Sequence, residues 1–468
     1  MKSLKSKMNS KVKFLLAAFC LAMAEPEPSL LDEMYSEEIK NVSLLHPFFE
    51  KLIKLEETKE GKINILHLGD SHIQSPFFPN TVRQILQQQF GNGGRGFVFP
   101  YSTGRGGSAS KPIAFVSNAM WQICRNNMQA KCDPSTEYGM SGYGFSTDFD
   151  QFVIAVEIND RKEQFNTIKI VSPPPAFRLA TASGTPMIQS VQSNVNNHKI
   201  KNGENLNTIA KKYNVSVEAI KRENNMNSNY IYAGKNLRIP VTVIETRVDT
   251  SMFKPLEYEL QDKFVSVYHQ EKPVSSIYLL PAVKQARYNL NGIILENDSP
   301  GIIYHSIGTV GSQVSHFNST PLFFEQLPVL SPDLVIISFG TNEAFGEVPA
   351  EKFIAQVDLM IQNVRAVCPD APIIVTTPPT SLFRRGILNH YALEYTASLM
   401  QKSDVSIWDL YSFTGGLEGA RDPSAIQIAH DNIHYTAQGY INQGTAFANS
   451  FLKEYIRYKH SRETTEAE

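Results

Sequence analysis

The sequence lacks an excess of either charge. Its 468 residues include 44 Lys and Arg against 46 Asp and Glu, a formal net charge of −2. This balance excludes the general electrostatic attraction by which basic proteins bind nucleic acids and anionic membranes. Long apolar runs are also missing. The run at residues 14–21 is too short to cross a bilayer comfortably. Cysteine is scarce, with 4 in the chain, and no Cys or His spacing matches a closed zinc site. We therefore expect no nucleic acid partner, no transmembrane helix in the mature chain, and neither a cofactor nor a metal.

Residues 1–24 have the pattern of a secretory signal peptide. Several lysines precede the apolar run 14–21, and the small-residue sequence Ala-Met-Ala at 22–24 follows it. This pattern predicts export across the inner membrane and a periplasmic or cell-wall location. Cys20 leaves lipidation open, although the bulky Phe19 before it is unlike the small residue that lipoprotein signals carry there.

The mature chain retains Cys124, Cys132 and Cys368. An exported compartment would permit Cys124 and Cys132 to form a disulfide across a short loop, and two free thiols are the alternative.

The length of the chain predicts two or more domains. Near-continuous apolar strands are expected at residues 63–68, 301–305, 334–339, 373–377 and 405–408. Helical patterns alternate with them, such as the stripe Phe353, Val357, Met360, Ile361 and Val364 and a final helix at about 437–458. Strands and helices that alternate in this way predict an α/β fold, in which helices cover both faces of a parallel sheet as three α/β/α layers.

Residues 101–196 and 241–295 have a different pattern. Short segments of alternating hydrophobicity, at 152–158, 167–171 and 264–268, are separated by Gly, Pro, Ser and Asn. This pattern is typical of a β-sandwich. We expect it as an insert in the α/β domain and as a candidate carbohydrate-binding unit.

Within the insert, residues 197–240 have the order strand, helix, helix, strand. This unit resembles a LysM module, a family that binds glycans containing N-acetylglucosamine. It departs from the family at Glu204-Asn205, where Asp-Thr is usual. The resemblance implies a bound glycan, while a module that serves only as a spacer is the alternative.

A candidate nucleophile follows the first expected strand. Gly69-Asp70-Ser71-His72 lies at a strand-to-helix turn, where the N–H groups of a helix N-terminus favour developing negative charge. Ser71 would be positioned there to attack a carbonyl. Alternatively, Ser71 only caps the next helix. His72 could line a site or pack in the core.

Other segments supply the groups that a nucleophilic serine needs. His434 could take the proton, and Asp431, three residues earlier, could hold the other imidazole nitrogen. Oxyanion donors could come from the side chain of Asn342 and the backbone N–H groups of Gly311 and Ser71, with Gly308 an alternative to Gly311. Each residue could instead only shape a turn or cap a helix.

These segments resemble, in order and in residues, the SGNH (GDSL-type) hydrolase family. The matching blocks are Gly69-Asp70-Ser71, Gly311, Gly340-Thr341-Asn342-Glu343, and Asp431 with His434. The resemblance implies an esterase with a catalytic triad of Ser71, His434 and Asp431 and an oxyanion hole of Ser71, Gly311 and Asn342. Its catalytic domain would comprise residues 25–100 and 296–460, followed by a tail at 461–468. Glu343 departs from the family, in which Asp usually follows the Asn.

Gly-Asp-Ser-His, combined with a sandwich inserted after the first block, resembles the peptidoglycan O-acetylesterases. The resemblance implies removal of acetyl from the 6-hydroxyl of N-acetylmuramic acid through an acetyl-enzyme. The expected partner is therefore an acetylated polysaccharide, most directly peptidoglycan. An O-acetyltransferase and an esterase of acetylxylan or another polysaccharide are alternatives, as is a non-catalytic peptidoglycan-binding protein that depends on the LysM-like unit alone.

A rival interpretation concerns His430 and His434, which have the spacing of the two histidines in the zinc-binding H-E-x-x-H helix. That motif requires a glutamate at the second position and a third ligand. Asp431, one methylene shorter, stands there instead.

Overall fold

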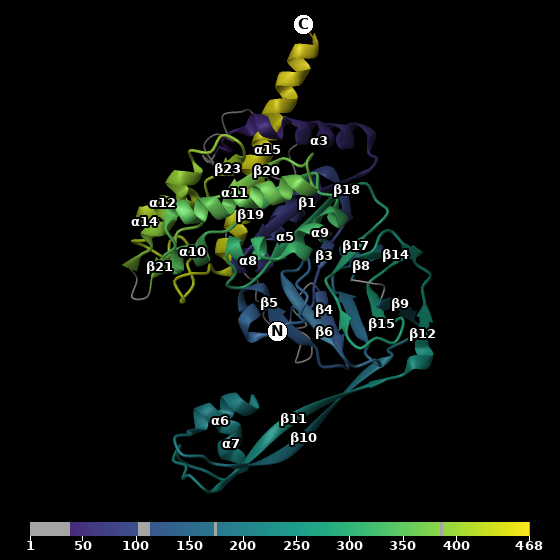
Figure 1. Cartoon of the computed structure of the whole chain (residues 1–468), viewed down its shortest axis with the longest axis vertical. Helices are drawn as coiled ribbons and strands as arrows, with labels where there is room; N and C mark the ends of the chain where they lie inside the picture. The colour runs from purple at the N-terminus through teal and green to yellow at the C-terminus, as the bar shows by residue number, and fades with distance from the viewer. Residues whose placement is uncertain (1–37, 102–112, 173–175, 384–386, 468) are drawn as a thin grey trace, which may run out of the picture.

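The computed structural model describes residues 38–101, 113–172, 176–383 and 387–467. The expected signal peptide at 1–24 and Cys20 lie outside these residues. Figure 1 shows an α/β body, a region of antiparallel sheets beside it, and a long two-stranded ribbon that carries two short helices at its far end. None of the helices in the described ranges combines the length and the apolar character needed to cross a membrane.

A parallel sheet lies at the centre of the α/β body. Within the described residues, its strands have the order β2-β18-β1-β19-β20-β23, and every neighbouring pair is parallel. The strand bounds are β1 Lys62–Gly69, β2 Asn92–Gly94, β18 Gly301–Gly308, β19 Leu334–Ser338, β20 Ile373–Thr376 and β23 Ser406–Trp408. The central strands are almost wholly buried, which explains their continuous apolar sequences.

Helices cover both faces of this sheet because successive side chains of a strand point to opposite faces. Ile65 of β1 packs with the helices α3 His46–Thr58, α5 Phe77–Phe90 and α15 Ala437–Ala467. The next residue, Leu66, belongs to the core on the other face, under α8 Val314–Asn318, α9 Pro321–Gln326, α11 Ala350–Val367 and α12 His390–Leu399. All five apolar residues of the expected stripe in α11 are buried. The predicted three-layer architecture is confirmed.

Short elements connect these layers. The helices are α4 Ser71–Gln74, α10 Thr341–Phe345, α13 Leu410–Phe413 and α14 Gly416–Gly419, with the 3-10 turns η1 Val42–Leu45 and η5 Leu327–Leu330. A small hairpin consists of β21 Leu382–Phe383 and β22 Ile387–Leu388. After β1 the chain forms α4 and then begins α5 at Phe77.

Antiparallel sheets form the expected β-sandwich, whose inner faces share one core with one face of the parallel sheet. One sheet consists of β12 Phe253–Pro255, β9 Phe177–Ala182, β15 Ser276–Pro281, β7 Ile154–Ile158 and β4 Ile113–Ser117. The facing sheet consists of β13 Glu259–Leu260, β14 Val265–Val274, β8 Phe165–Val171, β17 Gly292–Glu296 and β3 Gly96–Val98. A further sheet contains β16 Tyr288–Asn289, β6 Tyr143–Thr147 and β5 Gln122–Arg125, and the 3-10 turns are η2 Asn126–Lys131, η3 Arg161–Glu163 and η4 Thr250–Met252.

The chain passes from the parallel to the antiparallel region earlier than residue 101, the expected first residue of the insert. β2 pairs with β18 of the parallel sheet, whereas β3 already pairs with β17. Arg95 lies between the two strands, in the glycine-rich stretch where the sequence pattern changes. Three-residue strands are too short for periodicity to assign them to a sheet.

The ribbon and its helices have the predicted order of strand, helix, helix, strand. β10 Met187–Lys199 and β11 Asn236–Val248 pair along their whole length. Between them, α6 Leu206–Tyr213 and α7 Val217–Glu223 pack on a small core that includes Ile209, Ile220 and Ile239. Figure 1 shows that the paired strands extend well beyond this core and hold the helices away from the α/β body.

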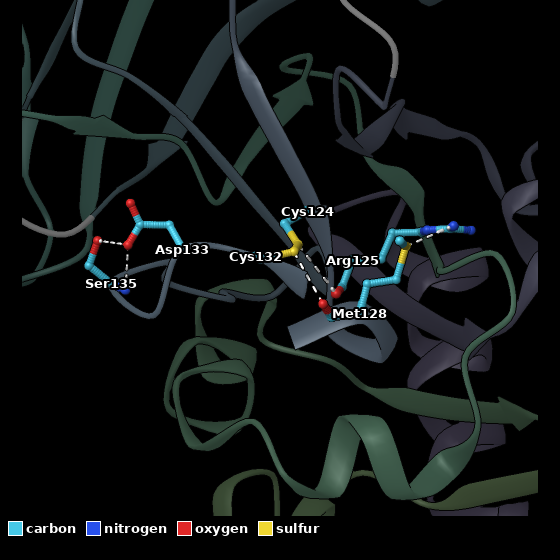
Figure 2. Close-up of a disulfide and its surroundings, with 6 residues drawn as sticks. All are labelled: Cys124, Arg125, Met128, Cys132, Asp133 and Ser135. Carbon is cyan, nitrogen blue, oxygen red and sulfur yellow. Dashed lines mark hydrogen bonds between the residues drawn. A yellow bond between two sulfur atoms is a disulfide. The ribbon is translucent and has the colours of Figure 1, made fainter. Parts of the chain in front are cut away.

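Cys124 and Cys132 form a disulfide, so the pairing alternative is correct. Their Cα atoms are 6.3 Å apart, and Figure 2 shows the bridge closing the end of β5 onto the loop after η2. Cys368 is a free, buried thiol whose pKa is raised to about 11 by burial.

Candidate active site

Ser71 begins α4 directly at the carboxyl end of β1. The preceding Asp70 is the N-cap, and its Oδ1 accepts a hydrogen bond of 2.9 Å from the His72 N–H. Because Asp70 supplies the cap, the Ser71 hydroxyl is not needed for it. The capping role that was the alternative for Ser71 is therefore filled by Asp70.

Ser71, His434 and Asp431 form a continuous hydrogen-bonded chain. Ser71 Oγ lies 2.8 Å from His434 Nε2, and His434 Nδ1 lies 2.6 Å from Asp431 Oδ2. Since an ionised carboxylate only accepts hydrogen bonds, Nδ1 carries the proton and Nε2 is left to accept the hydroxyl proton of Ser71. The three residues therefore have the geometry of a nucleophile, a base and a group that orients the base.

The turn that carries His434 is fixed by Asp431. Oδ1 of this carboxylate accepts hydrogen bonds from the backbone N–H groups of Ile433 (3.0 Å) and His434 (2.9 Å), which leaves Oδ2 for the imidazole. Partial burial acts to raise the pKa of Asp431, but the hydrogen bonds from the His434 side chain and the two backbone groups outweigh it and lower that pKa. Asp431 is consequently ionised at neutral pH.

Gly308 and Gly311 take different positions in the segment after β18. Gly308 is the last residue of β18, and a Cβ there would collide with backbone atoms of Gln74 and Asp70. Gly311 lies in the loop beyond, with φ of +75°, a conformation that suits glycine. Among the described residues, no acceptor contacts the N–H of Gly311 or that of Ser71.

Asn342 lies near the triad, but its amide already has partners. Gly340, after β19, leads into α10, and Asn342 Nδ2 donates to Asp70 Oδ2 and to Ser312 O, each at 3.0 Å. The amide nitrogen has two hydrogens, and both therefore have protein acceptors. An oxyanion that binds this amide must therefore share one of its hydrogens with Asp70 Oδ2 or Ser312 O, or replace that acceptor.

Two buried carboxyl groups near the site have roles that the motifs did not reveal. Burial raises the pKa of Asp70 to about 7, against the opposing hydrogen bond from His72 and the charge of His434. Burial also raises the pKa of Glu343 to about 7, and its Oε1 accepts a bond of 2.7 Å from Val314 N at the start of α8. Glu343 thus anchors the segment that follows the Gly311 loop. Both acids stand inside the matching blocks of the sequence, Asp70 before Ser71 and Glu343 after Asn342, but the blocks do not indicate their burial.

His72 is a buried side chain in contact with the base. Its Nδ1 lies 3.0 Å from the Tyr440 hydroxyl, and its ring centroid lies 5.4 Å from that of His434. Burial and the neighbouring charge of His434 lower the pKa of His72 to about 3. His72 is therefore neutral. It is buried in the core and also contacts His434 of the site, so both of the roles expected for it apply.

The rival zinc site does not form. Residues 430–434 are a turn rather than a helix, so His430 and His434 do not share a helical face. In the parts of the chain that the structure describes, no group of three or more His, Cys, Asp or Glu residues is arranged to hold a metal ion.

A pocket borders α4 on the side of the β-sandwich. Gln74, one helical turn after Ser71, lines it together with Asn80, Arg83, Arg95, Phe97 and Tyr101. Arg83 and Arg95 both bond to one carboxylate, that of Glu163, and to Asn80 Oδ1. Burial and the charge of Arg95 lower the pKa of Arg83 only to about 9, so this cluster has a net positive charge at neutral pH.

Comparisons with known proteins agree with this architecture. Residues 296–440 match the GDSL-like lipase/acylhydrolase family, and residues 198–240 match the LysM domain. A solved structure described as a peptidoglycan O-acetylesterase in action has 16% sequence identity and a TM-score of 0.58, over 88% of this chain and 96% of that chain. At this identity the likeness shows the fold.

Two other solved structures match a smaller part of the chain. A carbohydrate esterase family 3 structure from Talaromyces cellulolyticus has 17% identity and a TM-score of 0.27, over 33% of this chain and 72% of that chain. An acetyl esterase mutant with an acetate ion has 16% identity, the same TM-score of 0.27 and the same coverage, 33% and 72%. A comparison with curated proteins found no match. The fold and the matched segments together show that the chain contains a GDSL-type esterase domain of the SGNH hydrolase fold, and that a LysM domain is inserted in it.

Proposed function

We propose that this protein is an O-acetylesterase of a cell-wall polysaccharide, most directly peptidoglycan, and that it acts through an acetyl-enzyme on Ser71. The observation that carries the proposal is the hydrogen-bonded chain from Ser71 Oγ through His434 to Asp431. It lies at the carboxyl end of β1, the edge at which ligands of parallel sheets bind.

The reaction follows from the geometry of these groups. Ser71 Oγ attacks the acetyl carbonyl carbon while His434 Nε2 takes the hydroxyl proton, and Asp431 stabilises the imidazolium. The tetrahedral intermediate collapses when His434 returns the proton to the departing sugar oxygen. Water, deprotonated by His434, then attacks the acetyl-enzyme and releases acetate and Ser71.

The negative oxygen of the intermediate needs hydrogen-bond donors. The N–H groups of Ser71 and Gly311 lack protein acceptors among the described residues, so they are available to it. Asn342 joins them if the oxyanion takes over one of the contacts that its amide makes with Asp70 and Ser312. The oxyanion is a charged acceptor and binds an amide more strongly than the neutral carbonyl of Ser312 does.

Three observations favour peptidoglycan, an acidic glycan, as the substrate. The LysM domain belongs to a family that binds N-acetylglucosamine-containing glycans, and the similar fold is that of a peptidoglycan O-acetylesterase. The pocket beside α4 has two guanidinium groups and one carboxylate, and guanidinium groups pair well with ligand carboxylates. Peptidoglycan carries carboxylates on its stem peptides, whereas the xylan backbone is neutral.

We propose a periplasmic or cell-wall location, from the signal-peptide pattern at 1–24. The disulfide between Cys124 and Cys132 supports export, because disulfides persist in oxidising compartments.

The substrate is tested by acetate release from two polymers. We expect acetylated peptidoglycan to be deacetylated with a kcat/KM at least about tenfold above that for acetylated xylan, about 1.4 kcal/mol of discrimination. The assay measures free acetate at equal concentrations of acetyl groups, with the Ser71→Ala protein as the blank. Equal or faster release from xylan would contradict the choice of peptidoglycan, while leaving the esterase chemistry in place.

The LysM domain is expected to hold the protein on its polymer. Tyr230 and Tyr232, between α7 and β11, are 81% and 73% exposed, so their rings are accessible to a glycan. Replacing both by alanine should weaken pelleting with insoluble peptidoglycan by about fivefold or more, the loss of at least about 1 kcal/mol typical of aromatic contact residues.

The control is Ile456→Ala, which removes an exposed apolar side chain of α15 in the esterase domain and should pellet like wild type. Acetate release from a small soluble ester should stay at the wild-type rate in the double variant and in the control. The helices α6 and α7 of the LysM domain are held away from the α/β body, which contains the triad residues (Figure 1). Unchanged pelleting of the Tyr230→Ala/Tyr232→Ala protein would show that these side chains do not anchor it.

A further inference from the structure

The loop closed by the disulfide, residues 124–132, contacts the loop that carries Gly311. We call these the disulfide loop and the Gly311 loop, residues 309–312. Arg125 NH1 donates to Val310 O at 3.1 Å, and Asn127 Nδ2 donates to the same oxygen at 3.0 Å. The Ser312 hydroxyl donates to Asn126 Oδ1 at 2.6 Å, and both of these side chains are fully buried.

The α/β body holds the Gly311 loop from the other side. Val310 N donates to Gln74 Oε1 at 2.8 Å, and Thr309 N donates to Gly69 O at 3.2 Å. Ser312 O accepts from Asn342. The loop is therefore fixed partly by residues next to Ser71 and partly by residues of the inserted sandwich.

The contacts to Val310 O determine where the Gly311 N–H points. This carbonyl and this N–H belong to one peptide group, which is planar and trans, so they point in opposite directions. Two donors on the carbonyl thus fix the direction of the N–H. Without them, a peptide next to a glycine rotates easily, since glycine adopts both signs of φ.

The disulfide holds the two donors in place. Arg125 follows Cys124 directly, its NH2 lies 3.0 Å from Met128 Sδ, and the Cys132 sulfur contacts Met128 O (Figure 2). A covalent closure across 8 residues restricts the conformations open to the segment between its ends.

We propose that Arg125 and Asn127 are positioning residues that orient the Gly311 N–H toward the oxyanion, and that the disulfide between Cys124 and Cys132 maintains this orientation. The inserted sandwich thus completes the oxyanion hole of the esterase domain. This inference rests on the proposed function of Ser71 and Gly311.

The test compares Arg125→Met, Asn127→Ala and the double variant with wild type in acetate release from a soluble acetyl ester. We expect the double variant to lower kcat about tenfold with little change in KM. This loss is smaller than the roughly 10²- to 10³-fold loss that follows removal of an oxyanion donor, because the Gly311 N–H is still present and only its orientation is released. Arg125→Lys retains a donor and should recover part of the rate. Arg238→Met, in the LysM domain, is the matched control and should leave kcat unchanged.

Reduction of the disulfide provides a second measurement that needs no substitution. A mild thiol reductant should lower kcat of wild type, and it should have no effect on a Cys124→Ser/Cys132→Ser protein whose kcat is already low. The proposal would be overturned if the Arg125→Met/Asn127→Ala protein kept the wild-type kcat or showed only a raised KM. It would also be overturned if reduction of the wild-type disulfide left kcat unchanged. A wild-type protein that releases no acetate would instead refute the proposed function.

Discussion

Replacement of Ser71 by alanine is expected to reduce acetate release by at least about 10⁴-fold, to the level left by binding and the oxyanion hole alone. The substitution removes the only atom that can form the acetyl-enzyme in the proposed mechanism. His434 then has no hydroxyl to deprotonate at 2.8 Å from its Nε2. The reaction would be limited to slow attack by water.

The fold should tolerate this change, so that the result reports on chemistry. Asp70, rather than Ser71, caps α4, and alanine is favourable in a helix. Circular dichroism and the melting temperature should therefore match those of wild type. Ser75→Ala, at the end of the same helix, is the matched control and should retain full activity. Substantial acetate release by the Ser71→Ala protein would remove Ser71 from the proposed role.

The second large effect is expected from Asn342→Ala, which should lower kcat by about 10²- to 10³-fold, as for the loss of one oxyanion donor. The structure adds a second consequence. Asp70 Oδ2 and Ser312 O both lose their donor, and an unsatisfied buried acceptor costs about 1–3 kcal/mol of folding stability. We therefore expect a lower melting temperature as well as a lower kcat.

These two effects are separated by a control of similar structural cost. Asn318→Ala, at the end of α8, removes an amide that donates to Gln356 and touches no part of the triad. It should lower the melting temperature with little change in kcat. If Asn342→Ala behaves in the same way, Asn342 positions its neighbours and does not donate to the oxyanion.

Local sequence determined the elements of the esterase domain and where its motifs lie. The continuous apolar run of β1 identified a buried strand because a parallel sheet covered on both faces leaves no polar side to the strand. Since parallel strands end at one edge, motifs after β1, β18 and β19 were expected to meet there. Ser71 and His434 are 363 residues apart in sequence and in direct contact in the structure.

Tertiary structure alone decided which neighbours these residues have. No periodicity or motif links Arg125 with Val310, because their contact joins an inserted sheet to a loop 185 residues later. The same holds for the use of both Asn342 hydrogens and for the burial of Asp70 and Glu343, which depend on packing around each group. The sequence by itself therefore determined the chemical groups of the candidate site and the strands that present them, since strand pattern and motif spacing are local. Their orientation and protonation were decided only by the tertiary structure, because both depend on contacts between segments that are distant in the chain.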